Sequence, residues 1–322
     1  QRRPIHDFGG DTPDPDSVDE SMLDVRKAFI PRDGHFLLMS DWSQIELRIL
    51  AVNAQEPEWL LAFELGLDVH ELAALAAYGP KPADPDLAKW WRKLGKQINF
   101  GIVYGVGDVT LSVTIQRTPE ETGEFKDAYF ARFRKIKQHC TAVSRQCEEQ
   151  KWVANMWGRR RYLNRSESYK AVNFQVQGSS ADFMKDTFCR FRPLRLAGLA
   201  YCLNIVHDEY INEILYVNTE DAIPLIALRM QTSDRINCSL KADLSWSPKS
   251  WGEAESLDCV PCEGRGKVYP LSKAEMFDLF QHRQMKRLEA LLDDYTICEN
   301  CKGRGYDLTP IIEHRERMNA KG

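Results

Sequence analysis

The segment YCLNIVHDEYINEILYV, residues 201–217, constrains the fold of this chain most strongly, because it has the pattern of two short strands joined by a turn. The turn carries His207 and Asp208, and Glu209 follows directly. Carboxylates that are taken out of water are costly unless a positive charge neutralises them. The segment therefore predicts a β-hairpin whose acidic turn either faces water or holds a cation.

A second strand pattern also ends in a carboxylate. In HFLLMSDWSQIELRILAVNA, residues 35–54, an apolar run ends at Asp41 and helical spacing begins at Ile45. Helical patterns continue to about residue 150, so strands bracket a helical insertion and the predicted fold class is α+β. A strand end and a hairpin tip can meet at one sheet edge, where paired carboxylates would suit divalent metal ions such as Mg²⁺.

The segment WRKLGKQINFGIVYGVG, residues 91–107, has a stripe of functional side chains at helical spacing. Four residues recur at every fourth position, namely Arg92, Lys96, Phe100 and Tyr104. On a helix, two cations would lead into two rings over about 18 Å, which matches the phosphate-to-base polarity of a nucleoside triphosphate. An amphipathic helix with buried rings is the alternative. Gly101 and Gly105 favour the first interpretation, because glycine allows something to approach the backbone.

Composition and charge bound the remaining possibilities. The chain has 322 residues, of which 43% are hydrophobic and 28% charged, enough for one large and one small globular unit. The net charge of −4 is not that of a simple nucleic-acid binder, but residues 126–145 and 151–170 each hold six Lys or Arg against one acid. These stretches fit either a phosphate-backbone contact or a solvated helix face. Without a long apolar run or a secretory signal, an intracellular protein is expected, with no membrane contact.

Four of the nine cysteines form two similar knuckles, CVPCEGRG at residues 259–266 and CENCKGRG at 298–305. Their C-x-x-C-x-G-x-G pattern suits a tetrahedral structural zinc site, with free thiols or an oxidised pair as alternatives. The predicted zinc ligands are Cys259, Cys262, Cys298 and Cys301. Ser272 and Glu275 form a capping-box pattern ahead of a helix expected to end near Leu292. Residues 255–322 are therefore predicted to be a small zinc-stapled module that contacts DNA, docks a partner or clips the fold.

Three motifs, DWSQIELRILA, RKLGKQINFGIVYG and IVHDEY, resemble in their order and separation the catalytic motifs of family A DNA polymerases, the DNA polymerase I type. Connecting segments such as VRKAFIPRDG, GLDVH, WGRRRYL and AVNFQVQGSSAD are similar too. The resemblance runs from about Val25 to Ala254. It implies a right-hand polymerase fold over residues 21–254, with an antiparallel-sheet palm and helical fingers inserted at about 54–165. Residues 1–20 are expected to be an extended lead-in. Thumb and exonuclease domains are absent from this pattern, so a longer N-terminal region or a separate chain is expected to supply them.

The resemblance also implies residue roles in a template-directed DNA polymerase of bacterial or phage-like type that binds primer–template DNA and dNTPs. Asp41 and Asp208 would hold two Mg²⁺ ions, Glu209 would support them, and Lys96 would contact the triphosphate and protonate the departing pyrophosphate. Glu46 would act as the steric gate against a ribose 2′-OH. The other nucleotide-binding positions are Gln44, Ile45, Arg92, Phe100 and Tyr104. The expected DNA-binding positions are Arg160, Asn173, Gln177 and His207.

Three residues depart from the family pattern: Trp42 replaces a tyrosine, Tyr169 an arginine and Tyr210 an aliphatic residue. None of these changes removes an expected metal ligand. Two alternative functions are a single-subunit RNA polymerase-like enzyme, which Glu46 argues against, and a non-catalytic subunit that works through the zinc module. The intact Asp41, Lys96 and Asp208 argue against the second alternative.

Overall fold

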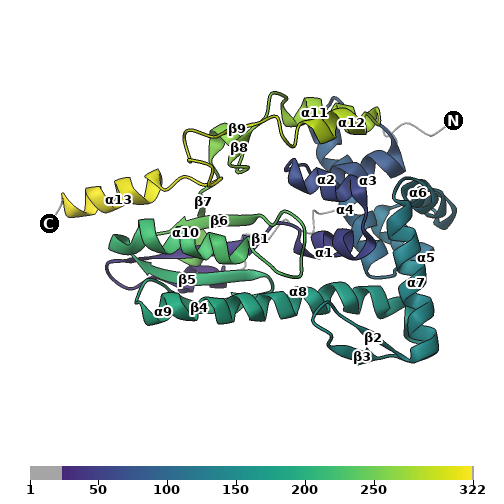
Figure 1. Cartoon of the computed structure of the whole chain (residues 1–322), viewed down its shortest axis with the longest axis horizontal. Coiled ribbons are helices and arrows are strands. Elements are labelled where there is room, and N and C mark those ends of the chain that lie inside the picture. The colour runs from purple at the N-terminus through teal and green to yellow at the C-terminus, as the bar shows by residue number, and fades with distance from the viewer. Residues whose placement is uncertain (1–23, 321–322) are drawn as a thin grey trace.

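A computed structural model describes residues 24–320 of the chain, and its centre is an antiparallel sheet in the order β4-β5-β1-β6-β7 (Figure 1). The central strand pairs with β5 on one side and with β6 on the other. The strands are β1 (His35–Trp42), β4 (Tyr201–Val206), β5 (Glu209–Leu215), β6 (Ala242–Ser247) and β7 (Glu255–Ser256). The structure therefore confirms the hairpin around His207 and Asp208 and the strand that carries Asp41. The expected lead-in over residues 1–20 lies outside the described residues.

The two faces of the sheet differ because side chains alternate along each strand. Phe36, Leu38 and Trp42 of β1 belong to the main hydrophobic core, which continues into α8 (Ala171–Arg190) and α10 (Thr219–Met230). Leu37 and Met39 point to the opposite face and form a small cluster with Ile211 of β5. The carboxylate of Asp41 lies on this second, less covered face.

The helices of residues 45–150, which follow β1, form a helical insertion in the right-hand part of Figure 1. Its helices are α1 (Ile45–Ala54), α2 (Pro57–Glu64), α3 (Val69–Tyr78), α4 (Pro85–Val103), α5 (Asp108–Ile115), α6 (Pro119–Arg132) and α7 (Arg134–Gln150). The sequence sets several helix starts, because Asp68, Asp84 and Thr118 cap α3, α4 and α6 through their side-chain oxygens. Helices α3 and α4 pack so closely that a Cβ at Gly95 would lie 2.1 Å from the carbonyl oxygen of His70.

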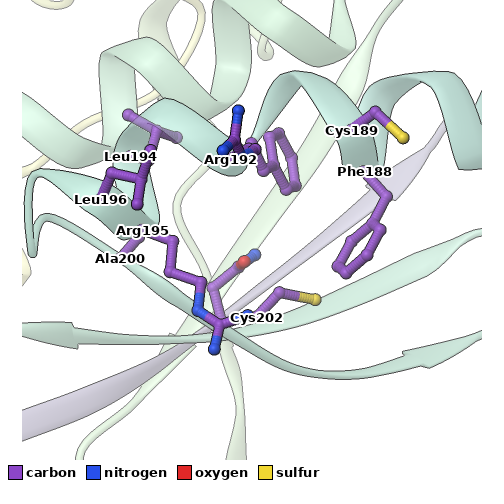
Figure 2. A pocket seen from close by; sticks show the side chains of 10 residues that line it. Phe188, Cys189, Arg192, Leu194, Arg195, Leu196, Ala200 and Cys202 are labelled. Carbon is purple, nitrogen blue, oxygen red and sulfur yellow. The ribbon is translucent and has the colours of Figure 1, made fainter.

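Short elements connect these layers. They are β2 (Trp152–Ala154), β3 (Arg160–Tyr162), α9 (Arg192–Leu196) and the 3₁₀ turns η1 (Val25–Ala28), η2 (Arg165–Lys170), η3 (Tyr216–Asn218), η4 (Trp251–Glu253) and η5 (Val260–Cys262). A cavity of about 440 Å³ lies between the end of α8, α9 and β4 (Figure 2). Its lining includes Phe188, Arg192 and Cys202, which differ from the predicted site residues.

The C-terminal extension, residues 255–320, packs on the rest of the chain. After β7 and η5 it contains β8 (Lys267–Val268), α11 (Lys273–Gln281), α12 (Met285–Ala290), β9 (Thr296–Ile297) and α13 (Thr309–Asn319). The capping box of Ser272 and Glu275 is confirmed at the start of α11. The helix expected to run to Leu292 is broken, because Arg283 adopts a positive φ of 54° between α11 and α12. In the described chain, residues 24–320, the helices are all too short or too polar to cross a membrane.

An ion pair between a buried carboxylate of β5 and the exposed Arg32 anchors the segment before β1. The carboxylate of Glu213, 3% exposed, accepts hydrogen bonds from the Arg32 guanidinium at 2.7 Å and from the Arg32 backbone N–H at 2.8 Å. Burial alone would raise the pKa of Glu213, but the Arg32 hydrogen bonds and charge lower it overall. A lowered folded-state pKa stabilises the fold above the unfolded pKa, and this stability is lost as pH falls through the folded value.

We expect Glu213→Gln to lower Tm at pH 7 and to have a smaller effect near pH 3. Thermal unfolding of both proteins at both pH values measures this, and an equal loss at both would contradict it.

Candidate active site

Three carboxylates stand side by side across the central strands of the sheet. Asp41 of β1 is in register with Glu209 of β5 and with Asp243 of β6. Asp208 lies beside them in the turn between β4 and β5, where His207 takes up a positive φ of 55°. The structure therefore brings Asp41, Asp208 and Glu209 to one sheet edge, as expected. The sequence reasoning missed Asp243, and its only signal was an acid within a short apolar strand pattern.

The electrostatics of this carboxylate row favour a bound cation. Burial, followed by the charges of Asp208 and Glu209, raises the pKa of Asp41 to about 7. Burial also raises the pKa of Glu209, although the indole N–H of Trp251 donates to it at 3.1 Å. The Oδ1 atom of Asp41 is buried and has no hydrogen-bond partner within residues 24–320. Hard oxygen ligands with uncompensated negative charge are the donor set that Mg²⁺ takes.

The number of ligands at this edge is small. Within the part of the chain that the structure describes, the four cysteines are the only group of three or more His, Cys, Asp or Glu whose ligand atoms all lie within 4.8 Å of one another. The carboxylate row would therefore need oxygens from water or from a substrate phosphate to complete the shell of an ion. Mg²⁺ sites built from one or two carboxylates and substrate phosphates have this character.

The predicted cation and ring stripe lies along α4 and its end. Lys96 is exposed, whereas the Nε atom of Arg92 lies 2.5 Å from Oδ2 of Asp68. Asp68 caps α3 and also accepts a hydrogen bond from Gln44 Nε2 at 3.2 Å. Arg92 thus has a carboxylate partner from α3 that the sequence reasoning missed. The signal was the aspartate in GLDVHEL, directly before a helical pattern.

The two rings of the stripe, Phe100 and Tyr104, stack on each other, and Phe100 also contacts the buried ring of His70. Phe100 stacks on Tyr104 with ring centroids 5.7 Å apart, and the buried ring of His70 lies 5.8 Å from Phe100. Burial lowers the pKa of His70 to about 4, and the Asn99 amide lies 3.1 Å from its Nδ1 atom. His70 is therefore a neutral side chain that fixes the position of Phe100, another residue that sequence reasoning missed.

Gly101 and Gly105 have a packing explanation. A Cβ at Gly101 would lie 2.9 Å from the Leu111 side chain, and one at Gly105 would lie 2.5 Å from the carbonyl oxygen of Tyr169. Gly105 also has a positive φ of 63°. The close approach that these glycines permit is made by the chain itself, so they lend no support to a ligand at the α4 backbone.

Glu46 contacts both Tyr104, a predicted nucleotide-binding residue, and Gln177, a predicted DNA-binding residue. It lies in the first turn of α1, 3.5 Å from the Tyr104 hydroxyl, which donates to it. Burial raises the pKa of Glu46, and a side-chain hydrogen bond with Gln177 opposes that rise. The neighbouring Ile45 is 1% exposed within the core, so any nucleotide contact there would involve its main chain.

The predicted DNA contacts come from three places. Asn173 and Gln177 share a face of α8 at a spacing of four, and the Oδ1 atom of Asn173 is buried without a hydrogen-bond partner in residues 24–320. His207 is exposed in the hairpin turn. Arg160 lies apart in the β2–β3 hairpin, with its guanidinium 4.3 Å from the centroid of the Trp152 ring.

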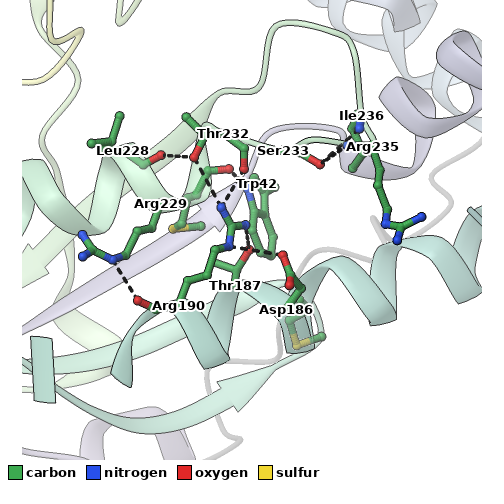
Figure 3. A network of polar contacts seen from close by, with 12 residues as sticks. Trp42, Asp186, Thr187, Arg190, Leu228, Arg229, Thr232, Ser233, Arg235 and Ile236 are labelled. Atoms are coloured by element: carbon green, nitrogen blue, oxygen red, sulfur yellow. Dashed lines mark hydrogen bonds and ion pairs between the residues drawn. The ribbon is translucent and has the colours of Figure 1, made fainter. Parts of the chain in front are cut away.

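Trp42 and Tyr210, two of the residues that depart from the family pattern, are in contact with each other. Trp42 packs edge-on against Tyr210 with ring centroids 5.5 Å apart, and it also packs against Phe183 at 4.7 Å. The Trp42 indole donates to the Met230 carbonyl at 2.8 Å, and the Tyr210 hydroxyl donates to the Met184 carbonyl. Figure 3 shows Trp42 beside the network in which Arg190 of α8 binds Asp186, Thr187 and Thr232. This enlarged aromatic cluster fixes the end of β1 next to Asp41.

The four knuckle cysteines form a second candidate site. All are buried free thiols, with Sγ atoms 3.8 Å apart for Cys259 and Cys298 and 3.7 Å apart for Cys262 and Cys301. A tetrahedral site with Zn–S bonds of about 2.3 Å places its sulfurs about 3.8 Å apart. The backbone N–H groups of Gly266 and Gly305 donate to Cys262 and Cys301 at 3.3 and 3.2 Å.

The knuckles cross so closely that glycine is required. A Cβ at Gly266 would lie 2.1 Å from the Gly303 carbonyl oxygen, and both residues have positive φ. Burial raises the pKa of Cys262 to about 12. Burial also raises the pKa of Cys259, whereas a hydrogen bond from the Cys301 backbone lowers the pKa of Cys298 to about 7. A cation among the sulfurs would favour the thiolate forms of Cys259 and Cys262.

Comparisons with known proteins agree with this architecture. The sequence profile of DNA polymerase family A matches residues 15–253. DNA polymerase I of Geobacillus stearothermophilus is 33% identical over 246 residues, covering 72% of this chain and 28% of the relative, and that of Caldicellulosiruptor bescii is 31% identical over 250 residues with 72% and 29% covered. The chain thus spans less than a third of the length of these relatives.

A solved structure with a similar fold is the "POL domain of Pol1 from M. smegmatis complex with DNA primer-template and dNTP". The TM-score is 0.66 at 27% identity, with 71% of this chain and 42% of that chain covered. The likeness confirms the α+β polymerase fold predicted from the sequence, in which the sheet layer is the palm and the helical insertion is the fingers. The profile match ends before the cysteine knuckles but runs through all three motifs that raised the resemblance, and the chain belongs to DNA polymerase family A.

Proposed function

We propose that this chain carries out template-directed DNA synthesis, transferring a nucleotidyl group from a dNTP to the 3′-OH of a primer. The observation that carries the proposal is the carboxylate row, in which Asp41 and Glu209 are in register, Asp208 lies in the adjoining turn, and one oxygen of Asp41 is buried without a partner in residues 24–320. Support comes from relatives named DNA polymerase I and from a neighbour solved with primer–template DNA and dNTP.

Asp41 and Asp208 are the residues that would hold two Mg²⁺ ions in this mechanism. When bound, such ions supply charge stabilisation to the attacking and leaving oxygens of an in-line displacement. The primer 3′-OH loses its proton to water, and its oxygen forms a bond to the α-phosphorus while the bond from that phosphorus to the bridging oxygen breaks and pyrophosphate leaves. Lys96 donates a proton to the leaving pyrophosphate, and Glu209, held by the Trp251 indole, supports the carboxylate pair.

The fingers residues bind the incoming nucleotide. Arg92 exchanges its ion pair with Asp68 for the triphosphate, next to Lys96. Phe100 and Tyr104 offer stacked rings to the sugar and the base, while Gln44 and Ile45 border the site. The DNA-contacting residues Arg160, Asn173, Gln177 and His207 test base-pair shape through the minor groove, where readout is largely independent of sequence.

Glu46 selects deoxyribonucleotides by its bulk in this proposal. We expect Glu46→Ala to raise the incorporation of NTPs relative to dNTPs by about tenfold or more, because a hydroxyl would fill the space that the side chain leaves. The isosteric variant Glu46→Gln should keep the discrimination. Competitive incorporation of one NTP and its dNTP measures both, and a ratio unchanged in Glu46→Ala would rule out the gate.

The four cysteines hold a structural zinc ion in the proposal, since their sulfur spacing matches a tetrahedral thiolate site. Because the reported relatives are bacterial, we also infer a bacterial or phage-like protein that acts where cellular DNA is copied.

Extension of a labelled primer by the purified chain tests the function. The reaction contains Mg²⁺ and either the four dNTPs or the four NTPs, and a second template changes the first unpaired base. We expect extension with dNTPs, with the first added nucleotide following the template. Extension with NTPs alone would indicate an RNA polymerase, and untemplated addition would also contradict the proposal.

A further inference from the structure

One end of the C-terminal extension holds the fingers. The Phe277 ring of α11 packs edge-on against Trp91 of α4, with centroids 6.2 Å apart. The Nζ atom of Lys81 lies over the Phe277 ring, 5.8 Å from its centroid. The carbonyl of Phe280 accepts a hydrogen bond from Arg132 of α6 at 2.9 Å. Trp91 is fully buried and precedes Arg92 directly, so α11 sits against the helix that carries the nucleotide-binding side chains.

The other end of the extension holds the palm. His314 of α13 stacks on Tyr216 with ring centroids 5.6 Å apart, and it meets Trp246 of β6 edge-on at 5.6 Å. Arg315 pairs with Glu220 of α10 at 3.1 Å. Figure 1 shows the extension running across the molecule from α13 beside the sheet layer to α11 and α12 beside α2.

The cysteine knuckles lie between these ends, and residues next to the first knuckle contact both layers. Lys241, directly before β6, binds Asp243 of the carboxylate row at 2.7 Å and Asp258, the neighbour of Cys259, at 3.2 Å. On the fingers side, the Tyr269 hydroxyl donates to the carbonyl of Glu64 at the end of α2 at 3.4 Å. The knuckles are therefore placed at the joint between palm and fingers.

Core packing and the cysteines together hold the extension: Met276, Phe280 and Ile311 belong to the main hydrophobic core, and the knuckles join short elements. Strands β8 and β9 have two residues each, and α11 and α12 have nine and six. Elements of this size do not hold their arrangement without a staple, and structural metal sites of small modules supply it. The rigidity of the connection between palm and fingers thus depends on the four thiolates together with the core packing of the extension.

We propose that the extension is a positioning element for nucleotide binding: the metal-stapled knuckles, anchored by α11 and α13, fix helix α4 relative to the carboxylate row. The inference rests on the proposed polymerase function. It assigns positioning roles to Phe277 and His314, which act through α4 and the sheet without touching the substrate.

The test removes the contacts at either end of the extension by substitution in the full chain. Phe277→Ala removes the fingers anchor, His314→Ala removes the palm anchor, and the double variant removes both. Asp278→Ala and Met318→Ala are matched controls, because they change exposed side chains of the same two helices. We measure zinc content, kcat and KM for single dNTP incorporation, and backbone hydrogen exchange of residues 85–103.

Each of the two anchor substitutions is expected to raise the KM for dNTP by about tenfold, equivalent to ~1.4 kcal/mol of binding. We expect a smaller change in kcat, faster exchange in α4 and an unchanged zinc content. The KM of the double variant should equal that of the more affected single variant. Losing the contact at one end of the extension already leaves α4 unfixed relative to the sheet, so losing the second contact should add nothing. The controls should behave as wild type.

An unchanged KM and unchanged exchange in α4, or effects of the two substitutions that simply add, would overturn the proposal and leave the extension as a stabilising cover. If Phe277→Ala fails to fold, Phe277→Leu provides the milder substitution. A wild-type chain that incorporates no dNTP would refute the polymerase function instead, and the hydrogen exchange of α4 would still decide whether the bridge exists.

Discussion

Asp208→Asn is expected to lower the rate of nucleotide incorporation by about a thousandfold. The substitution keeps the shape of the side chain and removes its charge, at a hairpin turn where the neighbouring His207 is exposed, so the fold should be unaffected. Metal-assisted stabilisation of the transition state is worth several kcal/mol, and each ~1.4 kcal/mol changes a rate tenfold. Single-turnover incorporation with saturating dNTP measures the effect.

Glu255→Gln is the matched control for that variant, because it neutralises an exposed carboxylate on β7 of the same sheet. The control should retain the wild-type rate. An Asp208→Asn protein within about tenfold of wild type would show that this turn is not where the reaction is supported.

Cys298→Ser is expected to release the zinc and to lower Tm by roughly 4 °C. Loss of a structural site removes binding free energy that stabilises the fold, and about 3 kcal/mol shifts Tm by this amount in a chain of this size. Residues of the extension belong to the main hydrophobic core, so the loss should reach beyond the knuckles. Elemental analysis together with thermal unfolding measures the change.

Cys189→Ser provides the control, since Cys189 is an exposed free thiol on α8 outside the knuckles. It should leave both the zinc content and Tm unchanged. A Cys298→Ser protein that keeps one zinc per chain, or a wild-type protein that contains none, would contradict the assignment of the four cysteines.

The features that the sequence could predict depend on local order along the chain. The turn at His207 and Asp208, the strand that carries Asp41 and the capping box at Ser272 each follow from neighbouring residues. The knuckle cysteines were also predictable, because ligand spacing is a local property. The stripe along α4 was predicted correctly as far as Phe100, while Tyr104 lies just after the end of the helix.

The features that the sequence could not predict are pairings between distant segments. Asp243 enters the carboxylate row only because β6 pairs with β1, and Asp68 meets Arg92 only because α3 packs on α4. Gly101 and Gly105 were interpreted as openings for a ligand, but Leu111 and Tyr169 fill those spaces. The contacts of the extension with both layers likewise depend on tertiary packing, which no local pattern encodes.

Binding of Mn²⁺ as a probe for Mg²⁺ tests the central claim most directly. Free Mn²⁺ would be followed by electron paramagnetic resonance in the presence of primer–template and dNTP, for the wild type, Asp41→Asn and Asp243→Asn. A primer that ends in a dideoxynucleotide prevents turnover. We expect the wild type and Asp243→Asn to bind the ion and Asp41→Asn to lose at least one site, since Lys241 already neutralises Asp243. Equal binding by Asp41→Asn and the wild type, or no binding by the wild type, would contradict a metal site at this edge of the sheet.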